Sequence, residues 1–280
     1  MVRDLPPVLA KIAKEELNED PRRLQDDLQH LKDWLAKQPH LLARIEDQWL
    51  VAVLRGCKFS LEKAKKKLDL FYTLRTTAPD VTLRIRPTDP KFLEFLRIGY
   101  AAFARMYIIL ILVYCPLICI VVLEDDAATV LGTKIITDYT GVSVNHLMQA
   151  SPSLLKKMVD SLPLRLKGSH HVNIPSGIEV IFTLIKGLIG KKANERLKIH
   201  KTNAQLLKEL PKEILPTEYG GSAGSVNDII GKSLLLYHSW LAQEEQHGTD
   251  ESKRPGKALS AQTMFGVEGV EGSFRKLDID

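Results

Sequence analysis

Two groups of side chains in this sequence have types that could bind a metal ion or transfer a proton. The first is the adjacent pair His170 and His171. Neighbouring residues of a strand point to opposite faces of a sheet, so this pair cannot readily hold one ion, and we expect two partly buried strand histidines. The second is the acidic triplet at residues 124–126, which lacks a partner base and an apolar pocket. We expect the triplet to form a helix end or a solvated turn.

Other reactive motifs are missing from the sequence. It contains no glycine-rich phosphate loop, His-Glu-x-x-His motif, Cys-x-x-Cys motif or serine nucleophile elbow. The cysteines are too few and too apolar in setting for a disulfide framework or a zinc site, which indicates a reducing compartment, the cytosol. They are Cys57, Cys115 and Cys119. We therefore expect a binding protein with no catalytic residue, no cofactor and no metal.

A binding function is favoured by an apolar segment that runs into a basic one. Residues 175–189 begin with proline, are followed by Gly190, and have hardly any polar face, as expected of a helix buried on more than one side. From Lys186 to Lys201 there are six Lys/Arg residues against the single carboxylate of Glu195. Such a charge suits anionic headgroups or nucleic acid. A core helix followed by a solvated loop remains the simpler alternative for this segment alone.

The overall composition is that of an ordinary, mildly basic soluble protein. The chain has 280 residues, 45% hydrophobic and 26% charged, with a net charge of +5. This length allows one or two domains, and the small positive surplus is only weak evidence for nucleic-acid binding. The amino terminus, with Asp4 and two prolines, does not have the pattern of a signal peptide.

Residues 1–80 are expected to be helical, because leucines recur at helical spacing and residues 20–21 and 60 have the types that begin helices. Residues 106–123 contain no charged side chain and reach the length of a membrane span. Pro116 interrupts this run, and charged residues lie at both of its ends. We prefer a buried helix that breaks near the proline, and a membrane-inserted segment is the alternative.

The rest of the chain alternates between strands and helices. Strands are predicted at residues 129–137, 168–173 and 196–201, separated by helical segments that include residues 175–189. That order is typical of an α/β unit with a largely parallel sheet. A helix is expected from Ser225 to about Gln246, and the polar tail from Thr249 is expected to be disordered.

Four separated motifs, in the expected order, resemble the CRAL-TRIO lipid-binding family. They lie at residues 53–64, with the Leu-Arg-x-x-Lys-Phe pattern, and at residues 136–141, 163–173 and 214–221. The resemblance extends over residues 24–246 and is closest to the branch of the α-tocopherol transfer protein and retinaldehyde-binding protein. It implies an N-terminal helical domain at residues 1–97, a lipid-binding domain with a parallel sheet floor and helical lid at 98–246, and a polar tail at 247–280.

The resemblance also implies where the sites lie. Residues 175–189 correspond to a mobile gate that closes over a lipid, beside a basic patch that holds a phosphoinositide headgroup. The patch corresponds to Arg165, Lys167, Lys192 and Arg196, and a further family arginine falls on Cys57, where the adjacent Lys58 is the substitute. The segments around the family cavity contain Ile136, Tyr139, Val142, Leu147, Met148, Leu155, Met158, Ile181, Phe182, Ile185 and Leu188. Each of these could equally belong to the core.

The chain departs from the family between residues 98 and 123, where one family strand and its loops are missing. We predict a monomeric, cytoplasmic carrier of a retinoid, tocopherol or similar lipid that docks transiently on phosphoinositide-bearing membranes and binds no nucleic acid. The alternative is a membrane-anchored adaptor in which residues 106–123 insert into the bilayer, and an enzyme is third. Which lipid is carried does not follow from the residue types.

Overall fold

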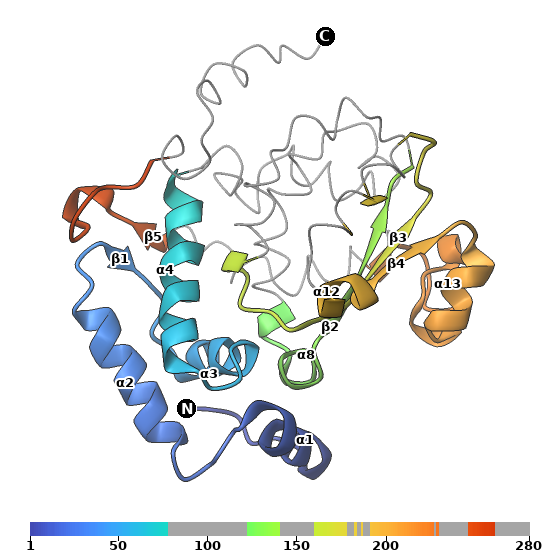
Figure 1. Cartoon of the computed structure of the whole chain (residues 1–280). Helices are drawn as coiled ribbons and strands as arrows, with labels where there is room; N and C mark the ends of the chain where they lie inside the picture. The colour runs from blue at the N-terminus through green and yellow to red at the C-terminus, as the bar shows by residue number, and fades with distance from the viewer. Residues whose placement is uncertain are drawn as a thin grey trace.

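Figure 1 shows a computed structural model in which a group of N-terminal helices lies beside a small parallel sheet. The structure describes residues 1–77, 122–140, 160–177, 182–183, 186, 191–226, 228–229 and 246–260. This mixed α/β arrangement agrees with the fold class expected from the sequence.

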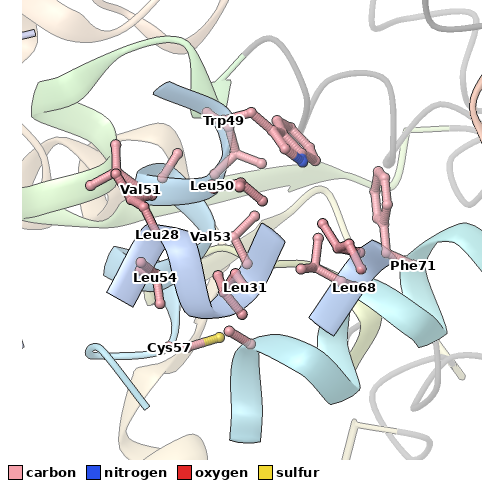
Figure 2. Close-up of a cluster of buried hydrophobic side chains, with 14 of the residues drawn as sticks. Leu28, Leu31, Trp49, Leu50, Val51, Val53, Leu54, Cys57, Leu68 and Phe71 are labelled. Atoms are coloured by element: carbon pink, nitrogen blue, oxygen red, sulfur yellow. The ribbon is translucent and has the colours of Figure 1, made fainter. Parts of the chain in front are cut away.

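The predicted helical region is confirmed. It contains α1 (Pro7–Leu17), α2 (Leu24–Ala36), α3 (Asp47–Gly56) and α4 (Leu61–Thr77). The last three pack into one core, in which α3 is buried along most of its length and the aromatic rings of Trp49 and Phe71 lie 5.9 Å apart (Figure 2). Burial of each large apolar side chain contributes about 1.5–3 kcal/mol, which makes this core the main source of stability for the N-terminal region.

Helix α1 contacts a different part of the molecule. Its Ala13 and Leu17 pack against Val130 of α8 (Asp126–Leu131), and its C-terminal cap is Asn18 in the left-handed conformation, with φ 63°. Asparagine tolerates this conformation better than most residues. Helix α1 is therefore held against the segment that precedes the sheet.

The three predicted strands are present and parallel. They are β2 (Thr133–Asp138), β3 (Leu166–Val172) and β4 (Leu197–His200), in the order β2-β3-β4. The first strand begins later than the predicted residue 129, because the carboxylate of Asp125 accepts hydrogen bonds from the backbone of Ala127 and Ala128 and thereby caps α8. The acidic triplet is thus the beginning of a helix, as expected.

One face of the sheet is covered by α13 (Asn203–Glu209) and the turns that follow it, η2 (Lys212–Ile214) and η3 (Thr217–Tyr219). Val172 of β3 lies in the core on this side with Leu206, Leu210, Leu215, Tyr219 and Val226. Strand β4 follows directly from the short helix α12 (Lys191–Arg196). Because side chains alternate along a strand, Ser169 and His171 point to the opposite face.

The expectation of a disordered tail is wrong for residues 249–260. Strand β5 (Gly248–Thr249) pairs antiparallel with β1 (Leu41–Leu42), and η5 (Glu251–Lys253) follows it. Arg254 then contacts Asp69 at 2.9 Å and Thr73 at 2.6 Å, both on α4. The polar side chains of this segment form hydrogen bonds and ion pairs with α4. A search for apolar periodicity in the sequence does not detect such contacts.

Within the described ranges, no helix has the length and apolar character needed to cross a membrane. Most of the uncharged run at residues 106–123 lies outside these ranges, as does most of the helix expected from Ser225 to about Gln246. The prediction that a family strand is missing between residues 98 and 123 also falls largely outside them. Leu123, at the end of the run, is buried in the core formed by α2, α3 and α4.

Candidate functional site

Asp138, the last residue of β2, joins three of the four sequence motifs. Its Oδ1 accepts hydrogen bonds from the backbone and hydroxyl of Thr140 and from the side-chain amide of Asn173, at 2.7–2.9 Å. Its Oδ2 accepts a hydrogen bond from the hydroxyl of Tyr219 at 3.1 Å. A buried carboxylate with four donors is well satisfied, so Asp138 fixes the carboxyl ends of β2 and β3 against the turn at residues 214–221.

A polar row lies on the face of the sheet opposite α13. The imidazole of His171 contacts Ser169 Oγ through Nε2 at 2.8 Å and Tyr139 Oη through Nδ1 at 3.1 Å. Phe182 belongs to the predicted gate and is buried. Its ring packs on the rings of His171 and Tyr139, at centroid distances of 4.8 and 5.6 Å. Burial lowers the pKa of His171 to about 4 and raises the pKa of Tyr139 well above its usual value. We call Ser169, His171 and Tyr139 the polar row.

The other histidine of the adjacent pair, His170, lies on the face of the sheet that α13 covers, as the strand geometry predicted. His170 stacks on His200 with ring centroids 5.1 Å apart, and Nδ1 of His170 contacts Nε2 of His200 at 2.9 Å. Burial lowers the pKa of both imidazoles, so one neutral ring can donate to the other. Across the described part of the chain, no group of three or more potential ligands is arranged to hold a metal ion.

Three of the predicted phosphoinositide-binding residues gather around the start of β3. Arg196 donates a hydrogen bond to the carbonyl oxygen of Leu166 at 2.7 Å, between Arg165 and Lys167 in the sequence. Arg165 in turn donates to the carbonyl oxygen of Val130. We call Arg165, Lys167 and Arg196 the cation cluster.

The cation cluster is already in contact with a carboxylate from α1. Glu16 Oε2 accepts hydrogen bonds from Arg165 at 2.7 Å and from Lys167 at 2.9 Å. The hydrogen bond from Lys167, followed by that from Arg165, holds the pKa of Glu16 well below its usual range, at about 2. The side chains of Glu16 and Lys167 are 48% and 36% exposed, so solvent and salt reach this contact.

The other two predicted cations are placed differently. Lys58 lies on the exposed turn between α3 and α4, with φ 53°. Just before that turn, the backbone of Gly56 at the end of α3 packs against Pro163, two residues before Arg165. Cys57, for which the resemblance predicted a corresponding family arginine, is buried, and burial raises the pKa of its thiol to about 11. Lys192 belongs to α12, but its side chain lies outside the described part of the structure.

The predicted lining residues are only partly described. Tyr139 and Phe182 contact each other on the face opposite α13. Ile136 instead packs against the core on the α13 side, where its register partner His170 also points. The remaining candidates lie outside the described residues; they are Val142, Leu147, Met148, Leu155, Met158, Ile181, Ile185 and Leu188.

The arginine of the Leu-Arg-x-x-Lys-Phe motif has a structural position. Arg55 is fully buried and donates to both carboxylate oxygens of Glu19 at 2.9 Å and to Asp126 Oδ1 at 2.7 Å. It therefore links the α1–α2 connection, α3 and α8. Sequence reasoning singled out the motif and the acidic triplet separately, but neither carried a signal that they pair. Glu16 and the contacts of Ser169 were also missed, for the same reason.

Comparison with known proteins identifies two domains in the chain. Residues 98–221 match the CRAL/TRIO domain, and residues 20–92 match a Pinta-like UBA domain. The chain therefore contains a CRAL/TRIO domain, the domain of the lipid-binding family that its four motifs resemble.

Individual relatives are similar to this chain over most of its length. The chain is 28% identical to the mouse (Mus musculus) protein named alpha-tocopherol transfer protein-like, over 80% of this chain and 73% of that protein. It is 26% identical to rat (Rattus norvegicus) clavesin-2, over 95% of this chain and 90% of that protein. A solved structure of Sfh5 aligns with a TM-score of 0.43 and 14% identity, over 79% of this chain and 89% of that one.

Proposed function

We propose that this protein is a carrier that takes up one hydrophobic lipid, such as a retinoid or a tocopherol, and exchanges it at phosphoinositide-bearing membranes. The observation that carries the proposal is the packing of Phe182 on Tyr139 and His171, because it places a residue of the predicted gate over the sheet face opposite α13. The CRAL/TRIO domain at residues 98–221 and the name of the mouse relative support the same function. The protein would act as a cytoplasmic monomer that meets membranes transiently.

The cation cluster supports membrane docking. Each Lys or Arg near an anionic surface contributes about 1 kcal/mol, so Arg165, Lys167 and Arg196 together would contribute about 3 kcal/mol. Arg165 and Arg196 are anchored through hydrogen bonds to backbone carbonyl groups, which limits the side-chain entropy lost when an anion binds. A phosphate group fits this arrangement because its oxygens can accept from several cationic donors at once.

Opening of the gate needs a compensating surface. A phenylalanine side chain that leaves a buried site for water loses about 1.5–3 kcal/mol. The membrane interface would accept that side chain, and a cation cluster on the same domain would hold the open form there. Uptake and release would therefore be coupled to docking.

Lipid extraction from donor vesicles tests the proposal. Purified protein is incubated with vesicles that contain a fluorescent tocopherol analogue and phosphatidylinositol bisphosphate, and the label recovered with the protein is measured. We expect Phe182→Asp to abolish loading, and Arg196→Glu to lower docking on the same vesicles. Thr183→Asp, at the exposed neighbour of Phe182, is the matched control and should load normally. Normal loading and docking by both test variants would refute the proposed gate and cation cluster.

The second candidate function is a membrane-anchored adaptor, which is favoured by the uncharged run at residues 106–123. Alkaline carbonate extraction of cell membranes separates the two functions, because it releases a peripheral carrier and leaves a spanning segment in the pellet. Release of the whole chain into the carbonate supernatant is expected. Retention in the pellet would support the adaptor.

A further inference from the structure

The polar row is unusual in its position for a protein that holds a hydrophobic ligand. Ser169 and His171 are two residues apart on β3 and therefore share the face opposite α13. Tyr139 reaches the same face from the end of β2, and Phe182 covers its ring and that of His171. Three hydrogen-bonding groups thus lie under the predicted gate. A purely apolar ligand would bind more tightly against apolar side chains at this place.

The polar row has more hydrogen-bond donors than it has hydrogen bonds between its own members. The two hydroxyls carry one hydrogen each, and the neutral imidazole carries one on nitrogen, which makes three donors for two contacts. If Nε2 carries the hydrogen, it donates to Ser169, and the serine hydroxyl is left with a free hydrogen. If Nδ1 carries it, the hydrogen of Tyr139 is the one left over. In either tautomer one hydroxyl at an end of the row can donate to a further acceptor.

The charge state of the row limits what that acceptor can be. Burial, together with the nearby cation of Lys186, lowers the pKa of His171 to about 4, so the imidazole is neutral at physiological pH. The three groups then carry no formal charge. An ionised head placed against them would lose its hydration without a counter-ion in the row, which is costly. Lys186 is half-buried on the gate side and is the cation that could change this preference.

We propose that the polar row is a subsite for the polar end of the carried lipid, and that this end is an uncharged oxygen acceptor, a hydroxyl or a carbonyl. This inference rests on the proposed carrier function and adds the chemical class of the ligand to it. The ligand lies with its oxygen at Ser169 or Tyr139 and its apolar part under Phe182. A pure hydrocarbon leaves the extra hydroxyl hydrogen unpaired and is disfavoured.

The test is displacement of the apolar fluorophore diphenylhexatriene by ligands of equal chain length, supplied at equal free concentration. The competitors are dodecanol, dodecane and dodecanoate. The readout is the affinity for dodecanol divided by that for dodecane, in the intact protein and in the variant Ser169→Ala/His171→Leu/Tyr139→Phe. A hydrogen bond of ordinary net strength predicts that this ratio is about fivefold higher in the intact protein. Tyr219→Phe, which removes a hydroxyl on the α13 side, is the matched control and should keep the high ratio.

Each outcome has one meaning. A ratio that is the same in the intact protein and the triple variant overturns the subsite, and so does tighter binding of dodecanoate than of dodecanol. If the triple variant does not fold, the intact protein alone decides, because equal displacement by dodecanol and dodecane would also overturn the subsite. Failure of the intact protein to bind diphenylhexatriene would overturn the carrier function itself, whereas binding without discrimination would overturn only the subsite.

Discussion

Two clusters of arginine and carboxylate take a glutamate from α1 or from the connection that follows it, Glu16 in one and Glu19 in the other, and the clusters differ in burial. Arg55 and Glu19 are fully or almost fully buried, and each of their charged atoms has a partner. Arg165, Lys167 and Glu16 form contacts of similar length, 2.7 and 2.9 Å, but Glu16 and Lys167 are substantially exposed. Contact distance alone does not distinguish the two clusters.

The difference in burial separates their roles. A buried ion pair cannot exchange partners without leaving an uncompensated charge, so the Arg55 cluster is a permanent link between helices. An exposed pair gains little net energy, because water and salt compete with it. Glu16 can therefore be replaced by an external anion at small cost. The same α1 region thus supplies one carboxylate that holds the fold and another that covers the cation cluster.

The largest expected effect is on the buried cluster. Arg55→Met leaves the carboxylates of Glu19 and Asp126 without their buried partner and should lower the free energy of unfolding by about 3–5 kcal/mol. Urea denaturation followed by circular dichroism measures it. Arg22→Met, which removes an exposed pair with Asp20, is the control and should leave the free energy of unfolding nearly unchanged. Equal losses in the two variants would remove the distinction between the clusters.

A smaller effect is expected in the exposed cluster, and on binding rather than stability. Lys167→Glu removes one positive charge and adds a negative one, which should weaken binding to phosphatidylinositol bisphosphate vesicles by about 2 kcal/mol, or about thirtyfold. Vesicle co-sedimentation at fixed salt measures this. Lys208→Glu makes the same change in net charge on the exposed side of α13, so it should bind nearly as well as the intact protein. A loss that is the same in both variants would indicate a response to net charge alone.

Removal of the Glu16 carboxylate, which covers the cation cluster, should strengthen vesicle binding. Glu16→Gln keeps the shape of the side chain but frees Arg165 and Lys167 from a negative charge, so vesicle binding should strengthen about fivefold. Glu15→Gln, at the exposed neighbouring position of α1, is the control. If Glu16→Gln binds no better than the control, the carboxylate does not compete with the headgroup.

The smallest effect concerns pH. The pKa of Glu16 is about 2 while it contacts the cluster and returns to its ordinary value of 4.5 when an anion displaces it. Competition between the Glu16 carboxylate and an external anion is therefore fully present above pH 4.5, and it is lost as the pH falls from 4.5 towards 2. The affinity advantage of Glu16→Gln over the intact protein should be constant between pH 7 and about pH 5.5. An advantage that already shrinks in this range would mean that the carboxylate is not held by the cations.

The sequence predicted those features whose cause is local. Helices α2, α3 and α4 and the parallel order of the strands follow from periodicity and from the alternation of elements. The strand alternation also placed His170 and His171 on opposite faces. The start of β2 was predicted too early, because the β-branched residues from Thr129 suggested a strand while the cap at Asp125 fixed a helix.

What the sequence did not show are contacts between distant segments. Glu16 is 149 residues from Arg165 and 151 from Lys167, and a single glutamate on an amphipathic helix carries no sign of its partner. The polar row was missed because Ser169 and Tyr139 were considered one at a time. The structure of residues 249–260 was not predicted, because Arg254 holds this segment against α4 through polar contacts.

Native mass spectrometry of the intact chain, purified from cells without detergent, tests the carrier function most directly. We predict a complex of one chain with one lipid-sized molecule, which dissociates into free protein when collision energy is raised. Incubation with vesicles that contain phosphatidylinositol bisphosphate should convert the complex to free protein faster than incubation with neutral vesicles. A chain that carries no such molecule, even after incubation with a total membrane lipid extract, would contradict the account.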